Sequence, residues 1–211
     1  MYELPYFMEK DYTKTRSFIQ AHPFAIITGV DANQHPVATQ IPVLITEKEG
    51  KLTFRAHLMR QTDHHKAFLQ NPHVLVLFPG PHTYVSASWY TNPQQGSTWN
   101  YMTVHAKGTI SFLEPNELLN ILRDTTTHFE GASNTPGAYD TLPEEYVQKL
   151  AKAIVGFEIT VTALDAVFKL SQNRDEASYH NIIGKLKQGS ADAQYIAAEM
   201  EQRTSQLFKQ Q

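Results

Sequence analysis

The sequence predicts an α+β protein in which about seven antiparallel strands form a small closed or half-open barrel with helices around it. The chain has 211 residues, 41% hydrophobic and 18% charged, which is typical of a globular protein with a sizeable core. Short segments that alternate apolar and polar residues follow one another closely. Helical patterns fill the intervals and the last forty residues, an arrangement that favours an antiparallel barrel over a parallel sheet.

Seven segments have the alternation or the apolar run of a β-strand. In residues 51–57, Leu52, Phe54 and Ala56 share one face, and polar side chains occupy the other. Residues 73–80 are continuously apolar and are expected to form a central strand. The predicted strands are residues 24–30, 36–46, 51–57, 73–80, 83–90, 102–113 and 156–164.

Helices are predicted where capping residues precede an apolar stripe. Asp11 and Thr62 are candidate N-caps, and Pro115 and Pro143 stand near two further helix starts. The expected ranges are residues 11–22, 62–70, 114–129 and 143–154. The expected inner stripes of the last two helices are Leu118, Leu122 and Phe129, and Tyr146, Leu150 and Ile154.

The C-terminal forty residues read as two helices separated at Gly189-Ser190. No repeat, low-complexity tract or flexible linker interrupts the chain before them. We therefore expect one domain over residues 1–188, followed by a C-terminal helix over residues 189–211.

Composition excludes several classes of protein. The chain has no cysteine, which excludes disulfides, thiolate zinc sites and cysteine nucleophiles. Its net charge of −3 gives no general attraction to nucleic acid, so DNA binding is possible but not supported by charge. No apolar run is long enough for a membrane span, and the N-terminus lacks the pattern of a signal peptide. We expect a soluble, cytoplasmic protein with no membrane association.

The polar strand faces carry an unusual mixture of cations, hydroxyls and aromatic rings. Arg55 and His57 share one strand, and Tyr101, His105 and Lys107 share another. Each residue alone suits an ordinary solvated surface. Together they suit an anionic ligand with a flat ring, because guanidinium and ammonium groups bind phosphate and aromatic side chains supply stacking area. The pattern predicts a phosphate-bearing aromatic cofactor.

Several motifs in order along the chain resemble the PaiB-like family of FMN-binding negative transcriptional regulators. They are FPGPHTYVSASWY, STWNYMTVHAKG, IVGFEITVT and FKLSQNR, with LPYF, ATQIPVLI and FRAHLMR toward the N-terminus. The resemblance runs from about residue 1 to about residue 188. It implies the FMN-binding split-barrel fold, FMN as cofactor, and a homodimer with the flavin at or near the subunit interface.

Two departures from the family pattern affect the expected site. Family members often carry alanine-arginine and then asparagine-proline where this chain has residues 58–62; Arg60 is kept and the asparagine-proline pair is not. A proline usually follows the serine of YVS, where this chain has Ala87. The turn before Ser88 is therefore expected to differ.

The candidate cofactor-binding residues follow from type and placement. A phosphate is expected near the strand end and helix start at His57 and Arg60, with Lys66, Lys107 and Lys169 as other candidate cations. A helix N-terminus there could add N–H donors, whereas His64 and His65 equally suit a solvated helix face. The full set is His57, Arg60, Lys66, Ser86, Ser88, Trp99, Asn100, Tyr101, His105, Lys107, Lys169, Ser171 and Gln172.

Some of these residues have a second interpretation. Ser86 and Ser88 could bind phosphate or ribityl hydroxyls, and Lys107 could stabilise negative charge on a reduced flavin ring. Trp99 suits either ring stacking or packing at a dimer interface. The polar run from Lys169 through Ser171 and Gln172 suits either a ligand or a turn that satisfies its own backbone.

The residues leave two classes of function open. The first is a flavin-binding regulator that lowers expression of other genes, as the resemblance implies, although no basic recognition helix is evident. The alternative is a small FMN-dependent oxidoreductase, for which His105 is the best acid–base candidate and no catalytic residue is assigned. A protein that senses or stores flavin lies between them. Histidine spacing predicts no metal site, and no nucleophile elbow or dinucleotide loop is present.

Overall fold

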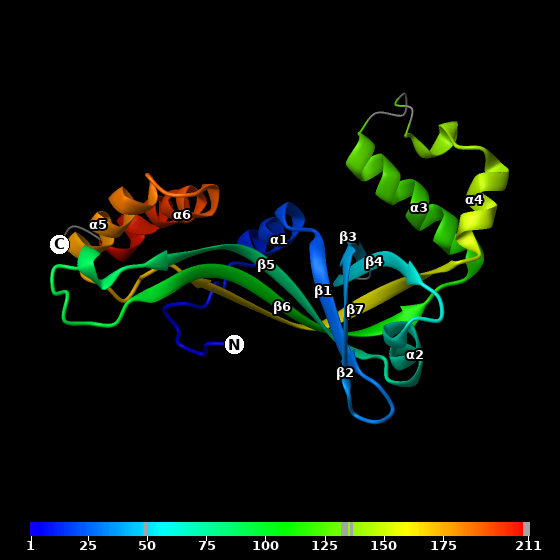
Figure 1. The fold of residues 1–211 in the computed structure, drawn as a ribbon, viewed down its shortest axis with the longest axis horizontal. Coiled ribbons are helices and arrows are strands. Elements are labelled where there is room, and N and C mark those ends of the chain that lie inside the picture. The colour runs from blue at the N-terminus through cyan, green and yellow to red at the C-terminus, as the bar shows by residue number, and fades with distance from the viewer. Residues whose placement is uncertain (49, 132–134, 136, 209–211) are drawn as a thin grey trace. The chain divides into compact units, whose positions relative to one another are not determined.

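The computed structural model describes residues 1–48, 50–131, 135 and 137–208 (Figure 1). The helices are α1 (Tyr12–Ala21), α2 (Asp63–Gln70), α3 (Pro115–Glu130), α4 (Glu144–Ala151), α5 (Glu176–Leu186) and α6 (Ala191–Leu207), with 3-10 turns η1 (Ala87–Trp89) and η2 (Tyr139–Thr141). The strands are β1 (Phe24–Val30), β2 (Pro36–Pro42), β3 (Leu44–Lys48), β4 (Lys51–Met59), β5 (His73–Val85), β6 (Thr98–Phe112) and β7 (Ile154–Lys169). None of the described helices is both long and apolar enough to cross a membrane.

The seven strands form one sheet in the order β2-β1-β5-β6-β7-β4-β3. The recorded pairings of β1 with β2 and β5, of β3 with β4, and of β4 with β7 are antiparallel. This confirms the predicted α+β class and the antiparallel seven-stranded architecture.

Two of the predicted strand segments divide or join differently in the structure, and β6 and β7 are longer than predicted. The segment 36–46 divides into β2 and β3, which pair with β1 and β4 respectively. Pro42 ends β2, because proline has no N–H to continue the ladder. The segments 73–80 and 83–90 instead join into β5, and its last predicted residues form the turn η1. The Ser86 hydroxyl caps this turn by accepting a hydrogen bond from the Ser88 N–H.

The predicted helix starts are confirmed, whereas the predicted inner face is right only in part for α3 and wrong for α4. Asp11 accepts hydrogen bonds from the N–H groups of the first turn of α1, and Thr62 caps α2. In α3 the buried residues are Leu118 and Ile121, whereas Phe129 is exposed. Helix α4 buries only Val147. In α3 the buried side chains are the ones that pack beside Gly156 of β7.

The chain forms two compact units, each assembled from separate segments. The first comprises residues 1–19, 79–104 and 165–211, and the second comprises residues 20–78 and 105–164. In the second unit, β4 and β7 bury Phe54, Phe157 and Ile159. Helices α3 and α4 lie beside each other in that unit (Figure 1).

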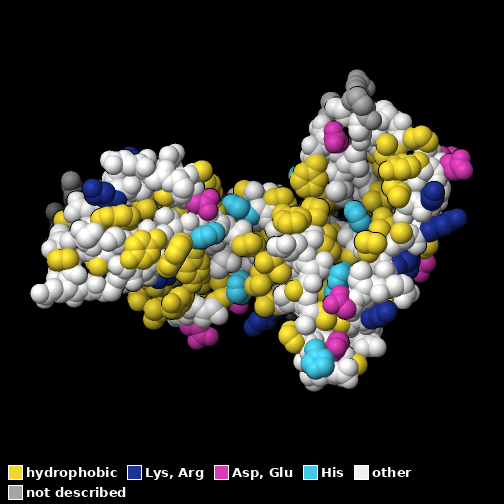
Figure 2. Space-filling model, viewed as in Figure 1, with side chains coloured by type: hydrophobic (Ala, Val, Ile, Leu, Met, Phe, Trp, Pro, Cys, Tyr) yellow, Lys and Arg dark blue, Asp and Glu magenta, His cyan; other side chains and the backbone are white. Residues whose placement is uncertain are grey.

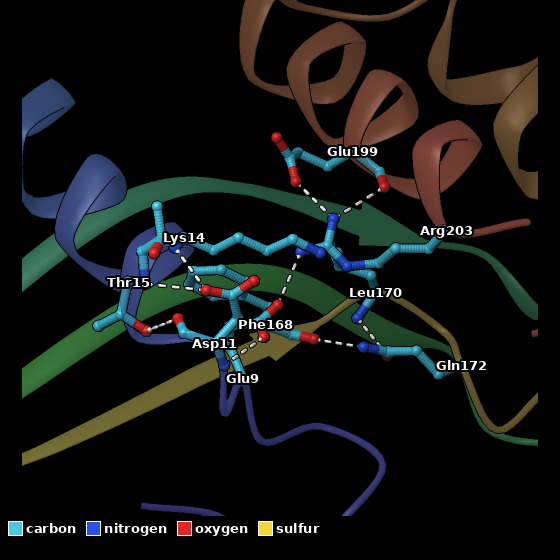
Figure 3. Close-up of polar contacts among 10 residues, drawn as sticks. Glu9, Asp11, Lys14, Thr15, Phe168, Leu170, Gln172, Glu199 and Arg203 are labelled. Carbon is cyan, nitrogen blue, oxygen red and sulfur yellow. Dashed lines mark hydrogen bonds and ion pairs between the residues drawn. The ribbon is translucent and has the colours of Figure 1, made fainter. Parts of the chain in front are cut away.

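The first unit is held by a buried ion network around Arg203 of α6 (Figure 3). The guanidinium donates to the Glu9 carboxylate at 3.2 Å and to the Glu199 carboxylate at 2.5 Å. It also lies 5.6 Å from the centre of the Phe168 ring. The N-terminal segment pairs with β7 through the Phe7 carbonyl and the Phe168 N–H, at 2.9 Å. The network therefore joins α6, β7 and the N-terminal segment.

Candidate functional site

Arg60 directly follows β4 and is held by two hydrogen bonds to residues at the start of β7. The Arg60 backbone N–H donates to the Ala153 carbonyl at 2.9 Å. Its side-chain Nε donates to the Ile154 carbonyl at 2.8 Å. Among the described residues, no hydrogen bond engages its two terminal guanidinium nitrogens. The contact at Nε therefore fixes the plane of the group and leaves its forked end available for an anion.

Arg60 opens onto a groove of the second unit with a cavity volume of about 360 Å³. The groove is lined by Arg60, Pro115, Asn116, Leu118, Leu119, Gln148, Ala151 and Lys152. These described residues include two cations and two amides, and none of them is acidic. The groove can bind an anion and an adjoining apolar group, since its remaining lining residues are apolar.

The close packing of α3 on β7 beside this groove requires a glycine at position 156. A Cβ at Gly156 would lie 3.1 Å from Ile121 Cδ1 and 3.3 Å from Leu118 Cα, so a side chain there would push α3 outward. His57 is the register partner of Gly156 on β4 and therefore projects from the same face of the sheet. Burial lowers the pKa of His57 below its ordinary value, so this residue is neutral at pH 7.

The start of α2 is largely occupied by its own side chains. The Thr62 hydroxyl donates to the Met59 carbonyl and accepts from the His65 N–H. The Asp63 carboxylate accepts from the His64 N–H at 2.7 Å. These contacts leave few free N–H donors at this helix end. Lys66 is exposed on the same helix, and the assignment of a ligand to it stays a prediction.

His65 is buried and holds an unusual turn. Gln61 adopts a φ of 65°, in the left-handed region that non-glycine residues seldom occupy. Its N–H donates to His65 Nδ1 at 3.1 Å, which places the imidazole proton of neutral His65 on Nε2. The ring also packs edge-on against Phe112. Protonation of Nδ1 would remove this acceptor.

Acid is expected to destabilise the protein partly through His65. Burial, and then the positive charges of Arg60, His64 and Lys66, lower the pKa of His65 in the folded protein. The unfolded chain takes up its proton near pH 6.5, before the folded chain does, so stability is lost as the pH falls below about 6.5 toward the folded pKa. Urea unfolding of wild type and His65→Gln, at about pH 7.5, 6.5 and 5.5, measures this. The variant should lose less stability; equal losses in both proteins would contradict the assignment.

Lys107 and Arg60 lie far apart in the second unit. The Lys107 carbonyl accepts a hydrogen bond from Thr162 of β7, whereas Arg60 bonds to Ile154 at the other end of that strand segment. Eight residues of strand separate these points, or roughly 25 Å. His105 is half-buried two residues before Lys107 on β6. The predicted roles of both residues stay predictions, independent of the Arg60 groove.

In the first unit, the polar run after β7 has partners within the protein. Lys169 Nζ donates to Thr98 Oγ1 at 2.5 Å and to the Trp99 carbonyl at 2.9 Å. The Ser171 hydroxyl donates to Asn100 Oδ1 at 2.9 Å. Burial, and then the charge of Arg174, lower the pKa of Lys169. These contacts join the end of β7 to β6, and the binding of a ligand by Lys169 and Ser171 stays a prediction.

Gln172 closes the same turn through its side-chain amide. Its Oε1 accepts from the Leu170 N–H at 2.7 Å, and its Nε2 donates to the Phe168 carbonyl at 2.5 Å. Both ends of the amide are therefore used locally. Side-chain hydrogen bonds to the nearby backbone are common in amide-rich turns.

The remaining predicted residues lie on β6 and η1 of the first unit. Trp99 is 52% exposed and packs edge-on against Tyr84, with ring centroids 5.9 Å apart. Tyr101 is half-buried, and burial raises its pKa. The hydroxyls of Ser86 and Ser88 lie 2.8 Å apart. Hydrophobic side chains gather over β6 and the N-terminal segment in Figure 2.

Comparison with known proteins agrees with the motifs in the sequence. The family model described as "Putative FMN-binding domain" matches residues 1–163. The chain is also 32% identical over 204 residues to the protease synthase and sporulation protein PAI 2 of Bacillus subtilis, covering 96% of this chain and 98% of the relative. This chain belongs to the FMN-binding domain family. The predicted PaiB-like resemblance and FMN as the cofactor of the family are thereby confirmed.

Solved structures support the fold of this FMN-binding domain. The FAD and heme binding protein of Mycobacterium smegmatis superposes with a TM-score of 0.59 at 14% identity, covering 77% of this chain and 73% of that chain. The flavocytochrome Anf3 of Azotobacter vinelandii gives a TM-score of 0.55 at 14% identity, covering 80% and 72%. At these identities the similarity shows the fold, which is the predicted split barrel.

Three polar residues of the Arg60 groove in this FMN-binding domain could not be predicted from the sequence. They are Asn116 of α3, Gln148 of α4 and Lys152, which follows α4. All lie more than fifty residues from Arg60 in the chain, in segments read only as helices. No local signal distinguishes them from other solvated helix residues. Within the described residues, no group of three or more histidine, aspartate or glutamate side chains could hold a metal.

Proposed function

We propose that this protein binds FMN and that the Arg60 groove of the second unit holds its phosphate. The observation that carries the proposal is the Arg60 guanidinium, which is anchored at Nε and has its forked end on a groove without a lining carboxylate. A phosphate dianion suits this donor set, because a guanidinium can bind two of its oxygens while Lys152 supplies a second positive charge.

The other groove residues suit the remainder of a flavin nucleotide. The amides of Asn116 and Gln148 can bond hydroxyl groups, and Leu118 and Leu119 provide apolar surface. When bound, FMN would supply one- or two-electron redox chemistry. The residues of the groove bind and orient the nucleotide.

Comparison of FMN with riboflavin tests this proposal. The two ligands share the ring and ribityl chain and differ by the phosphate. We expect FMN to bind at least about tenfold more tightly in equilibrium dialysis, because one charge-assisted contact contributes about 1.5–3 kcal/mol. Equal affinities for both ligands would contradict a phosphate site.

We also propose that the protein is a homodimer whose interface includes β6. Trp99 and Tyr84 are about half exposed in the first unit, and Tyr2, Leu4 and Tyr6 are exposed on the N-terminal segment. An apolar surface of this kind commonly marks an interface. Light scattering at micromolar concentration should give about twice the chain mass of 23.9 kDa. Trp99→Glu should shift the mass toward one chain, and a wild-type monomer would contradict the dimer.

A regulatory role is proposed to act without direct sequence-specific binding to DNA. The net charge of −3 gives DNA no general attraction, so any complex should be weak and strongly salt-dependent. The regulator would then act through a partner. Gel-shift titrations at two salt concentrations test this; a nanomolar, sequence-specific complex formed by the purified protein at physiological salt would contradict it.

A further inference from the structure

The first unit contains a second groove, between the turn η1 and helix α5. Its cavity volume is about 450 Å³. It is lined by Ser88, Trp89, Tyr90, His180, Asn181, Gly184, Lys185 and Gln188. Four of these residues, His180, Asn181, Gly184 and Lys185, lie along one face of α5, and Gln188 follows the end of the helix. The opposite face of α5, including Tyr179, Ile182 and Ile183, is buried in the core.

The charge of this groove favours an anion. His180 and Lys185 line it, and no acidic residue is among its described lining residues. His180 Nε2 lies 3.9 Å from Glu176 Oε1, so the carboxylate offsets the positive charge of the imidazole when it is protonated. Lys185 has no ion pair among the described residues. An anionic group in the groove would therefore find one uncompensated ammonium.

Two aromatic side chains give the groove flat walls. Trp89 is half-buried, and Tyr90 is buried with Arg174 stacked 4.0 Å from its ring centre. That stacking fixes the orientation of the tyrosine ring. Asn181, Gln188 and Ser88 add amide and hydroxyl groups that can bond the edge of a heterocycle. Flat apolar walls with polar groups at the rim suit a planar aromatic ligand.

Gly184 keeps the groove open on its helical side. A Cβ at this position would meet no atom within 4 Å, so the space beside it is empty rather than packed. Glycine within a helix is less favourable than alanine, and here no close packing requires it. The absence of a side chain at Gly184 therefore widens the groove, although packing does not require a glycine there.

We propose that this groove is a second ligand site, which binds a flat aromatic ring bearing one carboxylate or phosphate. Lys185 would meet the anionic group, and Trp89 would contact the ring. The proposal goes beyond flavin binding, because no residue of this groove belongs to the Arg60 groove.

Calorimetric titration with two anions and their neutral counterparts tests the site. The probes are indole-3-carboxylate and AMP, compared with indole-3-carboxamide and adenosine, on protein with and without FMN. At least one anion should bind about tenfold more tightly than its neutral counterpart. Comparison of indole-3-carboxylate with AMP shows whether the site prefers a carboxylate or a phosphate. Binding of neither anion, or equal binding of the neutral compounds, overturns the proposal.

Three substitutions locate the bound probe. Gly184→Phe should remove detectable binding by filling the groove, whereas Gly184→Ala should retain it and serve as the folded control. Lys185→Ala should weaken the anion about tenfold and leave the neutral compound unchanged. Unchanged probe binding in Gly184→Phe overturns the location. Loss of FMN itself from Gly184→Phe, with retention in Arg60→Ala, would make this groove the flavin site and overturn the proposal of a separate ligand.

Discussion

Arg60→Ala is expected to weaken FMN binding by about 10- to 100-fold and to leave riboflavin binding nearly unchanged. The substitution removes a fixed guanidinium from a dianionic phosphate, a charge-assisted interaction of about 1.5–3 kcal/mol. Riboflavin lacks the phosphate, so it reports any general damage to the groove. Fluorescence titration of both ligands measures the difference.

Controls separate the charge of Arg60 from its structural contact. Arg60→Ala also loses the bond from Nε to the Ile154 carbonyl, so its urea midpoint should be compared with wild type. Arg123→Ala removes another exposed arginine of the same unit, one that lies near Asp140 and outside the groove, and should leave FMN affinity unchanged. Lys152→Ala should weaken FMN less than Arg60→Ala, since an ammonium lacks the paired donors. Equal losses of FMN and riboflavin in Arg60→Ala would contradict the phosphate assignment.

Arg203→Ala is expected to lower the free energy of unfolding by about 3 kcal/mol. The substitution leaves the Glu9 and Glu199 carboxylates without their guanidinium in a largely buried site, and breaking such a site costs far more than losing a surface pair. For a chain of this size the melting temperature should fall by roughly 6–12 °C. Calorimetry or urea unfolding measures the loss.

The matched control for this prediction is the exposed pair between Lys187 and Glu201 in the same unit. Lys187→Ala should change stability by less than about 1 kcal/mol, because solvent screens the pair. Adding Glu9→Gln to Arg203→Ala should recover part of the loss by removing an uncompensated charge. A similar small effect in Arg203→Ala and Lys187→Ala would show that the network contributes little.

Much of the fold could be predicted from the sequence because strand alternation and helix caps are local signals. The alternation in β4 and β6 and the caps Asp11 and Thr62 required only neighbouring residues. The division at Pro42 was missed because the apolar alternation continues across it, and only the change of strand partner reveals the break. The inner face of α3 packs beside Gly156, which follows Leu118 by 38 residues, and has no local signal.

The candidate site was predictable only in part for the same reason. Arg60 could be singled out because a cation at a strand-to-helix junction is a local pattern. The groove around it is assembled from α3 and α4, so Lys152 and Gln148 could be recognised only after folding. The run from Lys169 to Gln172 shows the converse: its polar residues suggested a ligand as well as a turn. In the structure Gln172 bonds within the turn, whereas Lys169 and Ser171 bond residues of β6.

The visible absorption spectrum of the purified protein tests flavin binding most directly. After incubation with FMN and removal of free ligand, we expect flavin bands at about one FMN per chain, bleached by dithionite and restored by air. Heat-released ligand should be FMN when analysed by chromatography. A folded protein that emerges colourless from the same treatment, with no flavin in the released fraction, would contradict FMN binding.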